Sequence, residues 1–386
     1  MNLARRNVML AVLAAALAVP TTLQLRRDAD SFVDISTVPL LFDGFTADQV
    51  AFITLAQPKA EQPPLDPNNP QPAKVAYDQL LLQRTDKGFV LGTGVLTGAP
   101  VLMERVERDV FAHLRTIRAD RDVLVQPNAT PEQLAQFGLD ELHAFVVRAV
   151  DVTQRNVIAE LFIGREAGAG QAGSEAVNGV FVRKTDSTDV VLYEFEKGWR
   201  RDVLPEQWLD KTIAKLEPDK VQRLSIKNAA TAGVKMVFER RDGKASWQAI
   251  DAPAGLGAVR QIEVENLVQR LRWIGAQDFR SPLRTAGNPA ALGLAPPQIE
   301  IELVVKEGDR NRTIQLAVGN KLDDKNEYYL TCNDGAFLMT WPAGTVAQFE
   351  LDVKAQLFDP PAPAPTKPDE VPKAPDDKKD DKKGGE

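Results

Sequence analysis

The sequence predicts an α+β fold built from two tandem repeats, each a mainly antiparallel sheet with one or two packed helices. A turn segment at residues 130–139 recurs in outline at 288–294, and a duplicated unit fixes the architecture before any other motif is considered. Short apolar runs separated by tight loops indicate antiparallel strands. A chain of 386 residues with 44% hydrophobic content can bury two cores of this kind.

The spacing between the two copies is nearly constant, as a duplication requires. Gly138 and Gly293 lie 155 residues apart (293 − 138), and Gly164 and Gly319 repeat that spacing (319 − 164). Two further matches agree with it within two residues, namely 83–86 with 239–242 and 113–117 with 270–274. We therefore expect equivalent residues to occupy equivalent places in the two copies.

One departure from this spacing follows the first strand of the first copy. Asp48 and Asp219 are 171 residues apart (219 − 48), which predicts an insertion of about fifteen residues in the first copy. The Pro-rich stretch 57–73 lies there, and proline cannot donate to a strand ladder, so we expect an exposed loop. A second loop, 166–178, is also longer in the first copy.

Each copy predicts the same series of strands. In the first copy the predicted strands cover 50–56, 76–84, 88–91, 141–151, 157–163, 180–184 and 190–195. In the second copy they cover 221–227, 234–241, 246–250, 298–306, 313–318, 327–332 and 336–341. The tight loops between successive strands make a mainly antiparallel sheet the expected arrangement.

A helix is predicted after the third strand of each copy. Val106, Val110 and Leu114 recur at helical spacing in the first copy, and Val264 and Val268 do so in the second. These stripes are expected to face the core of each repeat.

The duplicated turn follows this helix in both copies. Thr130 and Asn288 are residues that cap helix N-termini, and each is followed by a proline, which suits the first helical position. Gly138 and Gly293 can end the turn in a left-handed conformation. We therefore expect a short helix in both places.

The predicted organisation has four parts. Residues 1–27 form an N-terminal membrane anchor or signal segment, and 45–217 and 218–357 form the first and second α+β repeats. Residues 358–386 form a tail rich in Pro, Lys and Asp, which cannot bury enough apolar area to offset its ordering entropy and is expected to be disordered. A helix that includes Trp208 is expected to connect the repeats.

The first residues carry a targeting signal, because Arg5 and Arg6 precede a largely apolar run at 8–19. Small residues at 16–18 suit a cleavage site, whereas extension through Leu25 gives roughly the twenty residues that a bilayer span needs. We favour the uncleaved anchor with a cytoplasmic N-terminus. The expectation is a single-pass protein of the cell inner membrane with a periplasmic body.

Few residues in the chain are suited to catalysis. Cys332 has no second cysteine to pair with and is expected to act as a small buried hydrophobe, and His113 is expected on an exposed helix face. His143 is the only other histidine, and no cluster has metal-ligand spacing. We expect no catalytic, cofactor-binding or metal-binding residues. The net charge of −7, with interleaved acidic and basic residues, argues against nucleic acid as a partner.

Several motifs together resemble the bacterial family catalogued as domain of unknown function 4340. They are the strand start at 219–221, Trp247 before Pro253, the amphipathic helix that follows, the turn 292–294 and the strand ending at Gly319. The resemblance covers about residues 45–352 in two copies, and Phe89 stands where Trp247 lies in the second. It implies membrane-anchored envelope proteins of undetermined activity, some linked to ABC-type transport systems and to gliding motility, and it brings no catalytic residues.

Two classes of function remain open at this point. The preferred one is a non-enzymatic envelope accessory protein, which is anchored by its first segment and presents two similar domains to a membrane-protein partner such as a transporter permease. The alternative is an exported hydrolase or carbohydrate-binding protein that uses a cleft between the repeats.

Overall fold

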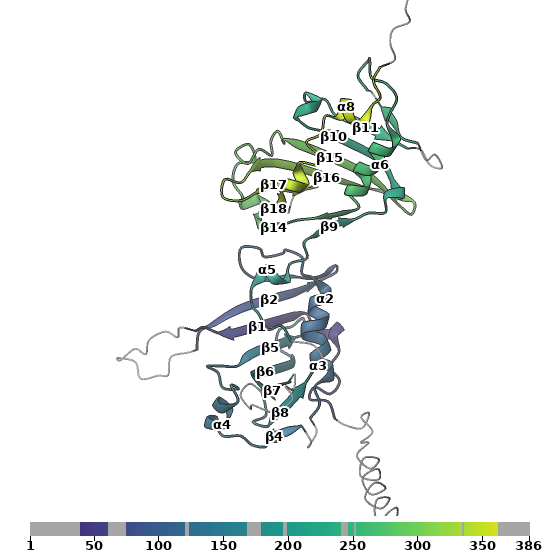
Figure 1. Cartoon of the computed structure of the whole chain (residues 1–386). Coiled ribbons are helices and arrows are strands. Elements are labelled where there is room, and N and C mark those ends of the chain that lie inside the picture. The colour runs from purple at the N-terminus through teal and green to yellow at the C-terminus, as the bar shows by residue number, and fades with distance from the viewer. Residues whose placement is uncertain are drawn as a thin grey trace, which may run out of the picture. The chain divides into compact units, whose positions relative to one another are not determined.

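The computed structural model describes residues 39–60, 75–119, 123–167, 179–195, 199–240, 246–250, 252–333 and 336–361 (Figure 1). The chain forms two compact units, Met1–Lys211 and Thr212–Glu386. The predicted anchor at 1–27, residues 61–73 of the insertion, residues 168–178 of the second loop and the tail beyond 361 lie outside the described residues. No helix among the described residues is long and apolar enough to cross a bilayer.

The first unit contains an eight-stranded sheet with the order β3-β2-β1-β5-β6-β7-β8-β4. Its strands are β1 (Phe52–Pro58), β2 (Tyr77–Thr85), β3 (Gly88–Leu91), β4 (Leu124–Gln126), β5 (Phe145–Val150), β6 (Val157–Ala167), β7 (Gly179–Lys184) and β8 (Val190–Glu194). Its helices are η2 (Ala47–Gln49), α2 (Met103–Val106), η3 (Glu107–Phe111), α3 (Ala112–Thr116), α4 (Pro131–Gln136) and α5 (Pro205–Trp208). The segments α2, η3 and α3 follow one another without a break, and η3 has π-helical hydrogen bonding.

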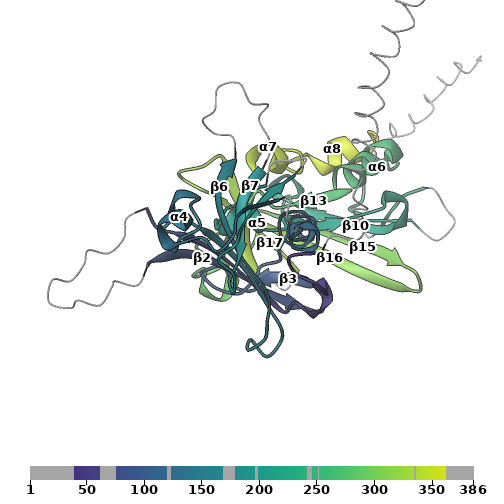
Figure 2. The ribbon, with the colours of Figure 1, turned by 90° about the horizontal axis from the view of Figure 1, so that it is seen from below.

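The second unit contains an eight-stranded sheet with the order β12-β11-β10-β15-β16-β17-β18-β14. Its strands are β10 (Val221–Lys227), β11 (Met236–Glu239), β12 (Gln248–Ile250), β14 (Asp278–Pro282), β15 (Ile299–Glu307), β16 (Arg310–Lys321), β17 (Glu327–Cys332) and β18 (Phe337–Pro342). A separate two-stranded ribbon pairs β9 (Thr212–Lys215) with β13 (Trp273–Gly275). The helices are η4 (Pro218–Lys220), η5 (Ala229–Thr231), α6 (Gln261–Arg270), η6 (Leu283–Thr285), α7 (Ala343–Val346) and α8 (Val353–Leu357), and α8 contacts α6 (Figure 2).

The two sheets have the same topology, strand for strand, and all of their described pairings are antiparallel. This confirms the α+β fold with two tandem repeats. Each sheet buries one face. Ile53 and Leu55 on β1 are buried, and so are the helical stripes that contain Val110 and Val264, so one side of each sheet packs against its helix.

The duplicated turn explains the repeated glycines of the first copy. Thr130 and Gln133 form the expected capping box at the start of α4, and Gly138 ends the turn with φ +68°. The carbonyl oxygen of Phe137 then accepts a hydrogen bond from the N–H of Arg165 at 3.0 Å. A Cβ atom on Gly164 would lie 2.2 Å from that oxygen, so only glycine allows the turn to approach β6 this closely.

The second copy repeats this close approach. Gly293 has φ +69°, and the carbonyl oxygen of Leu292 accepts a hydrogen bond from the N–H of Asn320 at 2.8 Å. A Cβ atom on Gly319 would lie 2.2 Å from the Leu292 oxygen, which matches the distance in the first copy. The spacing of 155 residues therefore reflects one docking contact that is present in both repeats.

An arginine holds the start of the first strand in each copy. Arg84 donates to the carbonyl oxygens of Val50 at 2.6 Å and Ala47 at 2.7 Å, and its guanidinium lies 4.7 Å from the ring centroid of Phe89. The equivalent contacts of the second copy involve the carbonyl oxygens of Val221 and Pro218 and the ring of Trp247, all contacted by Arg240. The matched residues at 83–86 and 239–242 thus have the same role.

Two predicted helices are absent or shortened. The segment after Asn288 forms hydrogen-bonded turns in place of a helix, because only a few residues separate its proline from Gly293. The connecting segment contains α5 of four residues and then β9, so the helix predicted around Trp208 was wrong for most of its length. Trp208 itself is buried. The compact units divide between Lys211 and Thr212, because β9 pairs with β13 of the second unit.

Candidate functional site on the open sheet face

The face of the first sheet that lies opposite the helix carries mixed side chains. Thr54, Arg148 and Glu160 are direct neighbours on β1, β5 and β6, and they alternate with buried residues along each strand. This open face is hollowed near the end of β1. We call the hollow, which has a volume of about 360 Å³, the first hollow, and it is lined by Thr54, Ala56, Val75, Tyr77, Gln79, Glu141, Val146, Arg148, Glu160 and Phe162.

Apolar groups from three strands lie next to one another in the first hollow. Ala56, Val146 and Phe162 are cross-strand neighbours in register, and Tyr77 begins the adjoining strand β2. The guanidinium of Arg183 lies 3.9 Å from the ring centroid of Phe162, so one face of that ring is already covered. Burial lowers the pKa of Arg183 from its usual value, although the nearby carboxylates act in the opposite direction.

Polar groups surround this apolar patch. The Tyr77 hydroxyl donates to the backbone carbonyl of Glu141 at 2.8 Å. Burial raises the pKa of Tyr77, and the charge of Glu141 adds to the shift. The Glu160 carboxylate lies 3.8 Å from the Arg148 guanidinium and accepts a hydrogen bond from the Thr185 hydroxyl at 2.8 Å. This combination of an apolar patch with charged groups of both signs suits contact with a protein segment.

The second unit has a hollow at the end of β10, and most of its lining residues do not correspond to those of the first hollow. The second hollow has a volume of about 670 Å³ and is lined by Lys227, Asn228, Ala229, Ala230, Gly233, Pro296, Pro297, Gln298, Ile299 and Glu350. By strand register, Lys227 occupies the place of Ala56. The buried side chain of Asn228 already donates to the carbonyl oxygens of Phe349 at 2.8 Å and Leu351 at 2.9 Å.

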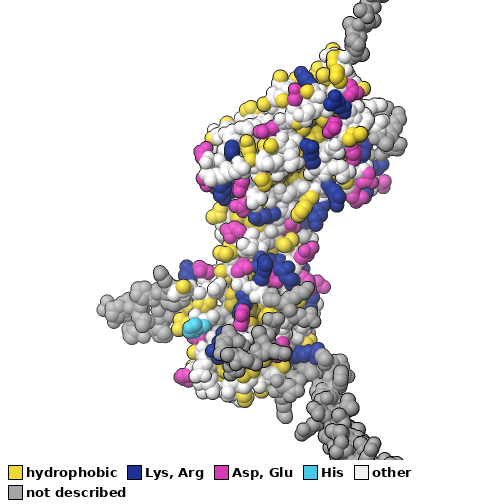
Figure 3. Space-filling model, viewed as in Figure 1, with side chains coloured by type: hydrophobic (Ala, Val, Ile, Leu, Met, Phe, Trp, Pro, Cys, Tyr) yellow, Lys and Arg dark blue, Asp and Glu magenta, His cyan; other side chains and the backbone are white. Residues whose placement is uncertain are grey.

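The open faces of the two sheets carry different side chains although the two sheets have the same topology. Glu300 lies where the first copy has Val146, and Ala317 lies where it has Phe162. On this face Lys235 pairs with Glu300 at 3.7 Å and with Glu302 at 2.8 Å. The second face is therefore a network of ion pairs, and the joined apolar patch belongs to the first repeat. On the face shown in Figure 3, basic and acidic side chains are interspersed over both units.

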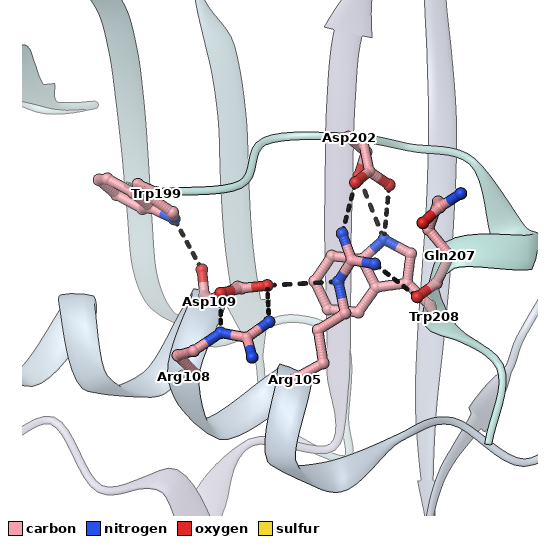
Figure 4. A network of polar contacts seen from close by, with 7 residues as sticks. All are labelled: Arg105, Arg108, Asp109, Trp199, Asp202, Gln207 and Trp208. Atoms are coloured by element: carbon pink, nitrogen blue, oxygen red, sulfur yellow. Dashed lines mark hydrogen bonds and ion pairs between the residues drawn. The ribbon is translucent and has the colours of Figure 1, made fainter. Parts of the chain in front are cut away.

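A buried network joins the helix of the first unit to the segment that leaves it (Figure 4). Arg105 and Asp109 are both nearly inaccessible, and the Arg105 Nε lies 3.2 Å from the Asp109 carboxylate without hydrogen-bond geometry. Arg105 also contacts Asp202 and the Gln207 carbonyl, and it stacks 4.5 Å from the Trp208 ring.

The same network includes an exposed cation and a buried indole. Arg108 donates two hydrogen bonds to the Asp109 carboxylate, at 2.7 and 2.9 Å, and Trp199 donates from Nε1 to the Asp109 backbone carbonyl at 2.8 Å. Because the charged groups pair with one another, we assign the network a structural role, which is to hold residues 199–208 against the helix.

His113 lies inside an aromatic cluster, so its expected place on an exposed helix face was wrong. Its ring stacks on Trp199 with 4.0 Å between centroids, and Nδ1 lies 3.0 Å from the hydroxyl of Tyr193. Burial lowers the pKa of His113 to about 4 and outweighs the nearby Asp109, which acts in the opposite direction. The ring is therefore neutral at physiological pH.

The remaining candidate reagents lie apart from the first hollow or are occupied. His143 contacts Asp140 at 2.7 Å on the surface. Cys332 is half-buried on β17, and burial raises the pKa of its thiol. The described residues contain no group of three or more His, Cys, Asp and Glu side chains placed to hold a metal ion.

Sequence reasoning missed both hollows. A signal was available, because 145–147 and 161–163 are unbroken apolar runs, and such runs place apolar side chains on both faces of a strand. The hollows also depend on which strands are neighbours, and the predictions did not specify that order.

The chain matches one family model, described as "Domain of unknown function (DUF4340)", over residues 99–297. The match begins before α2 of the first repeat and ends before β15 of the second, and it spans more than half of the chain. Neither a curated protein nor a solved structure matches the chain. The chain therefore belongs to the family of proteins with the domain of unknown function DUF4340.

Proposed function

We propose that this protein is a non-enzymatic accessory protein of the cell envelope that binds a membrane-protein partner through the open face of its first repeat. The observation that carries the proposal is the divergence between two equivalent faces. Two repeats with the same fold but different surface residues are expected when only one of them binds the partner, because the fold accepts either set of surface residues.

The partner class in this proposal is a subunit of an ABC-type transport system, such as a permease. Its support is the apolar run at 8–19, which suits a membrane anchor, together with what the family resemblance implies. The first hollow supplies a surface for protein contact, because Val146 and Phe162 lie beside the charged pair Arg148 and Glu160.

The repeat offers a matched test of this proposal. In the variant Val146→Glu with Phe162→Ala, the first face takes the residue types that the second face carries at 300 and 317. The full chain and this variant are purified from detergent-solubilised native membranes, and the recovered proteins are identified. We expect a transporter subunit with the native chain and a loss of at least tenfold with the variant. The control is Ala317→Phe on the second face, which should leave recovery unchanged.

Two results would overturn the proposal. One is recovery of no transporter subunit with the native chain. The other is equal recovery with the variant of the first face, provided that circular dichroism shows the variant to be folded.

A further inference from the structure

Trp273 is the one exposed tryptophan of the chain. All five tryptophans lie in the described residues, and the other four, Trp199, Trp208, Trp247 and Trp341, are at most 7% exposed. Trp273 is 69% exposed. A large aromatic ring left in water is informative, because its burial is favourable and tryptophan is usually well covered in folded proteins.

The fold of the repeat does not require a tryptophan at the position of Trp273. The spacing of 157 that relates Leu114 to Leu271 relates Thr116 to Trp273 and Arg115 to Arg272. In the first copy Thr116 donates to the backbone carbonyl of Ala112. The exposed ring is therefore a specific feature of the second repeat.

The ribbon of β9 and β13 presents this ring outward. Ile274 and Ala214 are paired and buried, so they form the inner side of the ribbon. Trp273 is paired with Lys215, and both are exposed. Because successive residues of a strand point to opposite sides, Trp273 and Lys215 share the outer side.

Cations flank the ring. Lys215 is paired with Trp273 across the ribbon and Arg272 precedes Trp273 in the chain; both are exposed, and neither forms an ion pair with a carboxylate of the described residues. Arg270 is also exposed and donates to the backbone carbonyl of Gln348 at 3.3 Å. In the first copy the equivalent Arg115 is paired with Glu107, so the flanking charge is free only in the second repeat. Trp273 lines neither of the two hollows.

We propose that Trp273 and its flanking cations form a docking site for an anionic lipid surface. An aromatic ring with a polar edge is suited to the headgroup region of a bilayer, and adjacent Lys and Arg side chains are attracted to acidic headgroups. Each such cation contributes on the order of fivefold to membrane affinity, so the pairing of indole and cations favours a bilayer over a neutral surface. This site is independent of the first hollow and of its partner.

The single exposed tryptophan makes the test specific. The full chain is reconstituted into vesicles of phosphatidylcholine, with or without phosphatidylglycerol, in which the acyl chains are brominated to quench nearby indole emission. We expect quenching in the vesicles that contain phosphatidylglycerol, with a several-fold loss when the anionic lipid is omitted or the salt is raised. Soluble glycerophosphate should produce no shift in emission, which distinguishes a lipid surface from free phosphate.

Two variants complete the test. Trp273→Phe removes the reporting ring, so its residual emission should be insensitive to the brominated lipid. Lys215→Gln with Arg272→Gln keeps the ring and should lose most of the quenching. Equal quenching in the native chain and Trp273→Phe would overturn the proposal. So would acrylamide quenching of Trp273 that is equal in vesicles with and without phosphatidylglycerol, or a Trp273 that is already protected from acrylamide in the detergent-solubilised chain.

Discussion

The repeated glycines give the sharpest prediction of stability. In Gly319→Ala the new Cβ would lie 2.2 Å from the carbonyl oxygen of Leu292, so the turn must move away from β16. Overpacking of this kind costs about 1–3 kcal/mol, and the hydrogen bond from the N–H of Asn320 to that oxygen is worth about 1 kcal/mol more. We expect a loss of about 2–4 kcal/mol from the free energy of unfolding of the second unit.

The matched control for this substitution is Gly344→Ala in α7. A Cβ atom on Gly344 would meet nothing within 4 Å, and alanine is favoured over glycine in a helix by about 0.5–1 kcal/mol. Both substitutions replace a hydrogen atom by a methyl group, but Gly319→Ala should lower the free energy of unfolding and Gly344→Ala should raise it. The difference between them isolates the close approach of the turn.

The assay uses the single cysteine as a reporter of the second unit. Cys332 is half-buried on β17, so its rate of labelling by a thiol reagent rises when that unit unfolds in urea. With a urea dependence of about 1–3 kcal/mol/M, the midpoint of Gly319→Ala should fall by about 0.7 M or more. Gly164→Ala in the first unit should leave that midpoint in place. A midpoint for Gly319→Ala within about 0.3 M of the native value would show that the close approach of the turn to β16 does not require glycine at 319.

Three further predictions concern the first unit and the arginine contact of the second. Burial lowers the pKa of His113 to about 4 in the folded chain, so its contribution to the free energy of unfolding is complete above pH 6.5 and is lost as the pH falls toward 4. Acid titration should show a loss of roughly 1–2 kcal/mol from this residue, a figure reduced for its partial exposure. The variant His113→Gln should lack that loss. Asp109→Ala should cost about 3 kcal/mol in urea unfolding because it removes one of the two carboxylates paired with the buried guanidinium of Arg105, whereas Arg115→Ala, which removes an exposed ion pair with Glu107, should cost less than about 1 kcal/mol. Trp247→Phe should cost about 1–2 kcal/mol, because the Nε1 hydrogen bond to Glu265 at 3.1 Å is lost while the ring contact with arginine is kept; an unchanged unfolding curve would contradict that assignment.

The elements with strong patterns could be predicted from the sequence. The strand at 221–227 and the strand at 327–332 lie where alternation placed them, because each buries one face in a large sheet. The capping box at Thr130 was also readable, since the cap, the proline and the closing glycine act over a few residues. Local chemistry decided these elements, and the tertiary structure agreed with it.

The elements that were missed depend on distant partners. The end strands β4 and β14 are short, and their place in the sheets comes from pairing with β8 and β18. The ribbon strand β9 replaced a predicted helix because Ala214 and its neighbours pair with β13, which lies far along the chain. The first hollow likewise arises where three strands meet, and no single segment of the sequence contains it.

The most direct test of the central claim compares two equivalent positions. Gln79 on β2 and Lys235, which precedes β11, occupy equivalent places by strand register beside the open faces of the two sheets. A photoreactive amino acid is introduced at each place in turn, and the full chain is irradiated in its native cells. We expect cross-links from position 79 to a subunit of a membrane transport system and none to that subunit from position 235. Equal cross-linking from both positions, or an absence of transporter subunits among the products from position 79, would contradict it.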